Sequence, residues 1–428
     1  MPHISSQLKA RGTHTTTLCK QKRKFGPMFL LRDGTERSIR GKLNSTAEMP
    51  RQSISSVRFH TLVKISAHHE TNQMSLQNLR EQIDSIDDEI VELLNKRSEL
   101  SVEVGKNKAN DANARYFAPE RERDLLQRLL QKHPHSPLTK DALTAIYREI
   151  ISASISLQKP ITVCFWGPRG TFTEMASRQR FGSSAKFVDA NSIPDVFSEV
   201  EHGHADYGVV PVETSTEGVV PYTLDMFHET SLKICAEIVM TVHQNLLTHA
   251  SSLTEIKRLY TFAQPLAQCR RWVETKLKDV EIIEVMPTTK CAQRASEDPE
   301  GAAIVAKAAS EVYGVPLLYE NIEDSVNNRT RFLVVGRNEP PATGRDKTSV
   351  LCAVKNEPGS LGRALRSFEV NNVNLSMIAS RPTKNAPWEY VQFMDVQGHV
   401  SDDAVSAALT ELRTHAIYVN VLGSYPEG

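Results

Sequence analysis

Residues 321–332 read NIEDSVNNRTRF, and the apolar run Phe332-Leu-Val-Val-Gly336 continues from them. The first part is polar, with four Asn or Asp among its first eight residues, and the second part has the composition of a buried strand. A polar loop that leads into a buried strand is a common place for ligand-binding side chains. Thr330 and Arg331 lie at the junction, and they supply a hydroxyl that can share a proton and a cation that can bind a carboxylate. An ordinary loop with a capping Thr and a solvated Arg would have the same local sequence.

The whole chain has 428 residues, enough for several domains with their own cores. Lys plus Arg and Asp plus Glu both number 51, so net charge indicates neither a nucleic-acid partner nor a membrane partner. The six cysteines are scattered without a C-x-x-C pair, which favours a reducing compartment. No apolar run approaches the roughly 18 residues of a membrane helix. We therefore expect a cytoplasmic protein, and we interpret His202, His204 and Asp206 as an exposed loop rather than a metal site.

Residues 1–73 are rich in Lys, Arg, Ser and Thr and poor in acids, and they lack sustained periodicity. This composition predicts a basic, largely disordered extension. A transit peptide and a nucleic-acid-binding tail are two explanations for it. Periodic sequence begins abruptly at Met74, so we favour either a true start there or a dispensable extension.

Residues 74–159 are predicted to form three helices. Apolar residues recur every three or four positions from Leu76 to Val104, and further helices are expected over 119–133 and 139–157. Arg97 and Lys108 share a face of the first helix and can bracket a small dianion. Arg80 lies about 25 Å before Arg97 along that helix, at 1.5 Å per residue, so only a second copy of the chain could bring it to the same ligand. Salt bridges between helices would produce the same pattern.

Three runs in this region, LREQIDSIDDEIVELLNKRSELSVEVGKNK, PERERDLLQRL and IISASISLQ, resemble the intertwined all-helical chorismate mutase family. The family has an Asp before the second run, where this chain has Ala118. Chorismate rearrangement needs no nucleophile, metal or cofactor, because the enzyme holds a folded dianion and stabilises charge on the breaking ether oxygen. The resemblance implies that the substrate carboxylates meet Arg97, Arg121 and a partner chain's Arg80, that Lys108 and Gln158 serve the ether oxygen, and that Glu122 and Ser154 bind the remaining groups.

Residues 160–337 change to short apolar strands that alternate with helices. This pattern predicts a mainly parallel sheet in two lobes, with a cleft at the carboxyl ends of the strands and the Thr330 loop returning across it. The polar turns 167–174 and 211–218 each follow a strand and precede a helix, an arrangement that can bind a carboxylate or phosphate. Neither the three-glycine pattern nor a Walker lysine is present, so no nucleotide cofactor is expected.

Four motifs in this region, GPRGTFTEMA, DYGVVPVETSTEG, AQPLAQCRRW and NIEDSVNNRTRF, resemble prephenate dehydratase, a two-lobed α/β fold like that of periplasmic binding proteins. The resemblance makes Thr330 the catalytic hydroxyl, which would donate a hydrogen bond to the leaving oxygen, with Arg331 and Phe332 beside it. The family usually has Asn at the position of Thr214. The resemblance also implies that the cleft is lined by Thr171, Glu213, Thr214, Ser215 and Thr216.

After a linker at 338–347, residues 348–428 are predicted to follow the order βαββαβ of a ferredoxin-like α+β domain. The segments NEPGSLG and ASRP resemble the ACT regulatory domain, which binds phenylalanine between two protomers in dehydratases of this family. The usual acid before Ser-Arg-Pro is Ala379 here, and a domain kept only for dimerisation is an alternative. The resemblance implies effector contacts from Gly359, Ser360, Leu361, Asn374, Ser380 and Arg381.

Together these three resemblances predict a homodimeric bifunctional enzyme without cofactor or metal. It would convert chorismate to prephenate and prephenate to phenylpyruvate in phenylalanine biosynthesis, with feedback inhibition by phenylalanine. A mutase with a degenerate dehydratase domain and a non-catalytic ligand sensor are the alternatives. Arogenate as a second substrate is left open.

Overall fold

The structure is a computed structural model that describes residues 75–111, 114–382 and 390–428. Every element below belongs to the unit Met74–Gly428. The predicted basic extension over 1–73 lies outside the described residues. None of the described helices is both long enough and apolar enough to cross a bilayer.

The N-terminal part of this unit consists of α1 (Leu76–Ala109), α2 (Pro119–Lys132) and α3 (Lys140–Gln158), as the sequence predicts. Ser75 and Thr139 cap α1 and α3 by accepting backbone N–H bonds, and Pro119 occupies the first turn of α2. Helices α1 and α3 approach closely at Gly105, where an added Cβ would lie 2.9 Å from the Cα of Gln158. This contact brings the C-terminal turns of both helices together.

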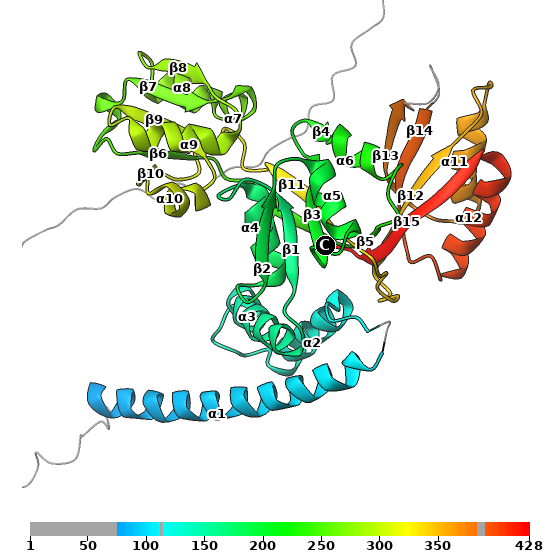
Figure 1. Ribbon diagram of the computed structural model, residues 1–428, viewed down its shortest axis with the longest axis horizontal. Coiled ribbons are helices and arrows are strands. Elements are labelled where there is room, and N and C mark those ends of the chain that lie inside the picture. The colour runs from blue at the N-terminus through cyan, green and yellow to red at the C-terminus, as the bar shows by residue number, and fades with distance from the viewer. Residues whose placement is uncertain (1–74, 112–113, 383–389) are drawn as a thin grey trace, which may run out of the picture. The chain divides into compact units, whose positions relative to one another are not determined.

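Helix α1 has 34 residues, drawn in Figure 1 as one long, gently curved rod, and spans about 51 Å at 1.5 Å per residue. Its apolar stripe is exposed in the single chain. Ser101 and Gly105 are the buried residues of this helix. The exposed fractions range from 47% to 68% at Leu76, Ile83, Ile86, Ile90, Leu93 and Leu100.

Between Thr162 and Gly336 the chain forms two sheets, with six and five strands. The strand order is β2-β1-β3-β11-β5 in the first, with β4 beside β3, and β10-β6-β9-β7-β8 in the second. The first sheet contains β1 (Thr162–Trp166), β2 (Lys186–Ala190), β3 (Tyr207–Thr214), β4 (Gly218–Val219), β5 (Lys233–Thr241) and β11 (Arg329–Gly336). The second contains β6 (Asn245–Thr248), β7 (Arg258–Thr261), β8 (Glu281–Glu284), β9 (Gly301–Val305) and β10 (Leu317–Tyr319).

Helices follow the strands in both lobes. The first lobe has α4 (Phe172–Phe181), α5 (Ile193–Glu201) and α6 (Pro221–Met226). The second has α7 (Ala263–Gln268), α8 (Arg270–Lys276), α9 (Thr288–Glu297), α10 (Ala308–Tyr313) and the 3-10 turn Leu253–Glu255.

The expectation of a mainly parallel sheet is wrong, because both sheets are mixed. Strand β1 pairs in parallel with β2 and β3, but β11 lies antiparallel between β3 and β5. The chain leaves the first sheet after β5, builds the second lobe, and returns through 321–328 to insert β11. A returning strand of this kind cannot be recognised from local periodicity, since its direction depends on where the intervening lobe ends.

The C-terminal part contains β12 (Asp346–Ala353), α11 (Ser360–Val370), β13 (Leu375–Pro382), β14 (Tyr390–Gln397), α12 (Asp403–His415) and β15 (Tyr418–Pro426). This is the predicted βαββαβ order. The four strands form an antiparallel sheet in the order β13-β14-β12-β15. Helices α11 and α12 pack together, and their apolar faces join one core with Val350, Met394 and Val396.

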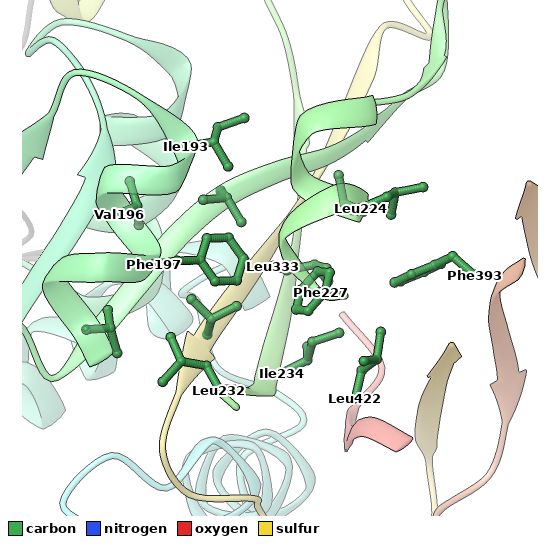
Figure 2. Close-up of a cluster of buried hydrophobic side chains, with 14 of the residues drawn as sticks. Ile193, Val196, Phe197, Leu224, Phe227, Leu232, Ile234, Leu333, Phe393 and Leu422 are labelled. Carbon is green, nitrogen blue, oxygen red and sulfur yellow. The ribbon is translucent and has the colours of Figure 1, made fainter. Parts of the chain in front are cut away.

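A second core joins this C-terminal sheet to the first sheet of the central part (Figure 2). Phe197 of α5 and Phe227 of α6 meet edge-on at 5.4 Å between ring centres, and Phe227 also contacts Phe393 of β14 at 6.0 Å. Ile234 of β5 and Leu422 of β15 belong to the same cluster. The C-terminal part therefore shares a core with the first lobe of the central part and is not an independent appendage.

Candidate active sites

Three consecutive helices line a cavity of about 240 Å³ in the N-terminal domain. The cavity contains six of the seven predicted mutase residues: Arg97, Lys108, Arg121, Glu122, Ser154 and Gln158. Ala118, which stands where the family has Asp, also lines it. The register of α1 and α3 brings these side chains together, because Gly105 permits the two helices to approach.

Hydrogen bonds hold the cations of this cavity in place. The Nζ of Lys108 donates to Oε1 of Gln158 at 3.0 Å and lies 5.3 Å from the ring centre of Tyr116. Arg97 donates to the Ser154 hydroxyl and to the carbonyl of Ile150. Both cations therefore have fixed positions before any ligand arrives.

The cavity crowds positive charge. Burial lowers the pKa of Lys108 below its ordinary value of 10.5, and the neighbouring Arg121 and Arg115 lower it further. Burial also lowers the pKa of Arg97, with a further contribution from Arg121. Like charges brought together in a partly desolvated cavity repel each other, and a bound dianion would relieve this repulsion.

Arg80 does not reach this cavity within one chain. It is exposed on the N-terminal half of α1 and is not among the residues that line the cavity. Its separation from Arg97, about 25 Å along one helix axis, keeps it away from the cavity of its own chain. The contribution of Arg80 from a second copy stays a prediction.

Glu122 connects the mutase cavity with the first lobe of the central domain. Its Oε2 accepts from Nη1 of Arg180 on α4 at 2.6 Å. The guanidinium of Arg180 lies over the ring of Phe117, 4.7 Å from its centre, and Phe117 packs on Phe181. Sequence reasoning missed Arg180, because nothing in the sequence of α4 points to a carboxylate on another domain.

A second cavity, of about 330 Å³, lies between the two lobes of the central domain. Four predicted dehydratase residues line it: Thr171, Thr214, Thr330 and Phe332. Among its lining residues, Glu217 is the charged side chain; the others are apolar, hydroxyl or amide groups. The first residues of α4 and α9 also line the cavity, so two helix N-termini meet it from opposite lobes.

Buried amides surround the position of Thr330, and sequence reasoning did not identify them. Oε1 of Gln268 accepts from the side-chain amides of Gln244 and Asn328, both at 2.9 Å. Gln244 is 3% exposed, and its Oε1 has no hydrogen-bond partner among the described residues. These groups form a neutral, hydrogen-bonding wall beside Thr330. The residue Thr330 is itself 8% exposed.

The polar run 321–328 is explained by its contacts with the second lobe. Oε2 of Glu323 accepts from the backbone N–H of Gln244 at 2.9 Å. Asp324 accepts from the backbone N–H groups of Arg271 and Trp272 at the start of α8. The acids of this segment therefore hold the returning chain in position for β11.

Four predicted residues do not line the cleft, namely Glu213, Ser215, Thr216 and Arg331. Ser215 accepts from the Arg329 N–H and donates to the Asn327 carbonyl, so it ties β3 to the returning chain. Thr216 accepts a long bond of 3.4 Å from Gln268. Glu213 points its Oε2 toward Nη1 of Arg331, at 3.8 Å.

Arg331 is placed on the opposite face of β11 from Thr330, which corrects the expectation that it would present a cation to the ligand. Successive side chains of a strand alternate between its two faces. Thr330 and Phe332 therefore face the cleft, and Arg331, 9% exposed, faces Glu237 and the C-terminal sheet. The motif NIEDSVNNRTRF contains the strand residues beside the cleft, but only the position of each residue in β11 decides to which face its side chain points.

The predicted effector residues lie in two places in the C-terminal domain. Gly359, Ser360 and Leu361 form the start of α11, where Gly359 has a φ of 79° that favours glycine. Asn374 precedes β13, and Ser380 and Arg381 lie on it. Arg381 forms a two-point ion pair with Asp225 of α6, at 3.0 and 3.1 Å.

Fold and sites define a class: a helical part with a cavity lined by several cations, a two-lobed α/β part whose cleft has no cationic side chain among its described lining residues, and a C-terminal part with the order βαββαβ. Residues 79–159 match the chorismate mutase type II family, and residues 163–340 match the prephenate dehydratase family. A bifunctional chorismate mutase/prephenate dehydratase from Aquifex aeolicus is 44% identical over 355 residues, which cover 82% of this chain and 98% of that relative. The chain belongs to the bifunctional chorismate mutase/prephenate dehydratase family.

Two solved structures resemble the central and C-terminal parts. A prephenate dehydratase from Arthrobacter aurescens in complex with L-Phe is 35% identical, with a TM-score of 0.59, and the match covers 62% of this chain and 90% of that one. A protein described as a quorum-quenching acylase is 28% identical, with a TM-score of 0.58, over 62% of this chain and 98% of that one. Because the same fold is described with different activities, the chemistry has to be argued from the site itself.

Proposed function

We propose that the chain converts chorismate to prephenate in the helical cavity and prephenate to phenylpyruvate in the cleft, and that phenylalanine inhibits the second reaction. The observation that carries the proposal is the contrast between the two cavities. Arg97, Lys108 and Arg121 crowd positive charge in the first. Thr330 lies in the second, whose described lining residues are apolar, hydroxyl or amide groups apart from Glu217.

In the mutase site, the cations hold the substrate dianion in its folded conformer. As the ether C–O bond breaks, negative charge grows on its oxygen, and Lys108 and Gln158 donate to it. Their mutual hydrogen bond of 3.0 Å fixes both donors in advance. Preorganised donors of this kind stabilise the transition state without further rearrangement. An acceleration of about a millionfold corresponds to roughly 8 kcal/mol.

In the dehydratase site, the bond from the ring to the departing carboxylate breaks to release carbon dioxide, and its electrons form the aromatic ring. The ring hydroxyl takes up one proton from solvent and leaves as water. Thr330 donates a hydrogen bond to the leaving oxygen. None of the described residues that line the cleft is cationic. This favours the reaction, since a cation paired with the carboxylate would stabilise the reactant more than carbon dioxide. The N-termini of α4 and α9 provide N–H groups for orienting the substrate.

The mutase site is complete only in a dimer. The exposed apolar stripe of α1 runs almost the whole length of the helix, and such a stripe is normally covered by a partner. An antiparallel copy of α1 would cover it and bring a partner's Arg80 to the cavity. The dimer is therefore supported by both the exposed surface and the unfilled carboxylate position.

The C-terminal domain is proposed to be an ACT domain that binds phenylalanine between protomers. Its βαββαβ order and its fusion with the catalytic lobe support this role. We further propose that residues 74–159, 160–337 and 348–428 are the three functional domains, joined by the linker 338–347.

The test is to measure the turnover of chorismate and of prephenate by the purified chain, with and without L-phenylalanine. Formation of phenylpyruvate that falls when phenylalanine is added supports all three assignments. Chorismate turnover without phenylpyruvate formation would leave a mutase with a degenerate second domain. Turnover of neither substrate by a folded protein would contradict the proposal and favour a ligand sensor.

A further inference from the structure

Arg331 is the centre of a buried ion cluster that the proposed chemistry does not use. Its Nε donates to Oε2 of Glu237 at 2.6 Å, its Nη1 to Oδ2 of Asp395 at 2.5 Å, and its Nη2 to the hydroxyl of Tyr425 at 2.9 Å. All five donors of a guanidinium lie in one plane, so three partners in different directions fix both its position and its orientation.

Within the buried part of the cluster, two cations face two carboxylates, because Lys347 donates to both carboxylate oxygens of Glu237 at 2.9 Å. A third carboxylate, the partly exposed Glu213, lies 3.8 Å from Nη1 of Arg331. Glu237, Asp395 and Tyr425 are almost completely buried. Burial by itself would lower the pKa of Arg331, but Tyr425, Asp395 and Glu237 raise it above its ordinary value. Arg331 therefore stays charged, and losing one member would leave an unpaired charge in the interior.

Two of the three hydrogen-bond partners of Arg331, Asp395 and Tyr425, come from a different domain than Thr330. Glu237 belongs to β5 of the catalytic lobe, but Lys347, Asp395 and Tyr425 belong to β12, β14 and β15 of the C-terminal sheet. The fourth strand of that sheet, β13, also reaches the cluster, because Sδ of Met377 lies 4.0 Å from Nη1 of Arg331. Three strands of the C-terminal sheet, β13, β14 and β15, thus contact Arg331 directly. The remaining strand, β12, reaches it through the bond between Lys347 and Glu237.

Thr330 precedes Arg331 in the chain, and both lie near the end of β11 that opens on the cleft. The register between β11 and β3 shifts here: Arg331 pairs with Glu213 and Phe332 with Pro211, so the bulged strand β3 has an extra residue at Val212. A bulge bends a strand and re-aims the side chains beside it. The direction of the Thr330 hydroxyl therefore depends on how the next residue is held.

We infer that Arg331 is a positioning residue for Thr330, through which the C-terminal sheet sets the activity of the dehydratase cleft. The inference rests on the proposed dehydratase function. A displacement of the C-terminal sheet moves Asp395, Tyr425 and Lys347 together, and the guanidinium transmits it to the backbone of β11. Chorismate turnover is independent of this path.

The test compares Arg331→Met and Asp395→Asn with the control Arg329→Met, a change at an exposed residue of the same strand. For Arg331→Met, kcat for prephenate should fall about 10-fold to 100-fold with KM almost unchanged, because a displacement near 1 Å can cost about 100-fold. Chorismate turnover by the same chain should be unchanged and reports the integrity of the fold. Asp395→Asn should lower kcat less and weaken the response to phenylalanine, and Arg329→Met should change neither.

Three results would overturn the inference. Unchanged kcat in Arg331→Met would show that the guanidinium does not position Thr330. A raised KM with unchanged kcat would make Arg331 a direct substrate ligand. If Arg331→Met loses both activities because it fails to fold, Asp395→Asn decides, and wild-type kcat and phenylalanine response in that variant would contradict the inference.

Absence of prephenate turnover in the wild-type chain would instead contradict the proposed function. The coupling between the C-terminal sheet and Thr330 is then measured by amide hydrogen exchange over residues 327–332. It should accelerate in Asp395→Asn and not in Arg329→Met, and equal exchange in all three proteins would overturn the inference.

Discussion

The mutase cavity and the dehydratase cleft handle closely related dianions with opposite electrostatics. Lys108 and Arg97 converge on the first, whereas Arg331, the cation next to Thr330, turns away from the second. The difference follows from the two reactions. A rearrangement that builds negative charge on an ether oxygen gains from fixed cations, but a decarboxylation gains nothing from a cation that stabilises the carboxylate.

The largest expected effect comes from Lys108→Met, which should lower kcat/KM for chorismate about 1000-fold, in the range for loss of one charge-stabilising donor. Turnover of prephenate should not change, because Lys108 lies in the other domain. Steady-state rates on both substrates check this. Equal loss of both activities would mean that the cavities are not independent.

Thr330→Ala should lower kcat for prephenate about 100-fold, since one hydrogen bond to the leaving oxygen disappears. Thr330→Ser, which keeps the hydroxyl, is the matched control and should retain most of the activity. Chorismate turnover should stay at the wild-type rate in both variants. Full dehydratase activity in Thr330→Ala would remove the hydroxyl from the mechanism.

The pH dependence should separate the two sites. The lowered pKa of Lys108 means that this group loses its proton below its ordinary 10.5, and the protonated form is the active one. The value of kcat/KM for chorismate should therefore fall with rising pH in the alkaline range, by about tenfold per unit once past the pKa. The pH profile of kcat/KM for prephenate should lack this alkaline fall. An alkaline loss shared by both profiles would indicate unfolding instead.

A cation added to the dehydratase cleft tests the electrostatic explanation directly. Gln264 is partly buried and lines the cleft, and Gln264→Lys should lower kcat for prephenate about fivefold while KM stays level or falls, as expected for stabilisation of the ground state. Gln264→Met controls for the loss of the amide. A kcat that rises with the added cation would reverse our interpretation of the neutral cleft.

Mixing two inactive variants tests whether the mutase site is built from residues of two chains. Arg80→Ala and Lys108→Met should each be nearly inactive on chorismate. After subunit exchange, half of the dimers would be hybrids with one intact site of two, so the mixture should regain about a quarter of wild-type activity. No recovery, with hybrid dimers shown to form, would place Arg80 outside the site.

The positions of the three helices, the βαββαβ order and the residues around the mutase cavity could all be predicted from the sequence. The determinants of the helices and of the strand order are local, namely apolar spacing and Pro119, and Arg97 and Lys108 share one face of α1. The other predicted residues of this cavity were implied only by the family resemblance. The exposed stripe of α1 was also foreseeable, because a helix that long needs a partner. The motif around Thr330 located the cleft in the same way.

The tertiary structure alone decided the directions and partners of the remaining groups. Arg331 and Thr330 are neighbours in sequence, but successive side chains of β11 point to opposite faces of its sheet. Arg331 therefore joins an ion cluster, and Thr330 faces the cleft. Gln244, Gln268 and Asn328 meet only because the chain leaves the first lobe and returns. Glu122 and Arg180 come from different domains. Such contacts depend on long-range packing, which no periodicity within a short segment records.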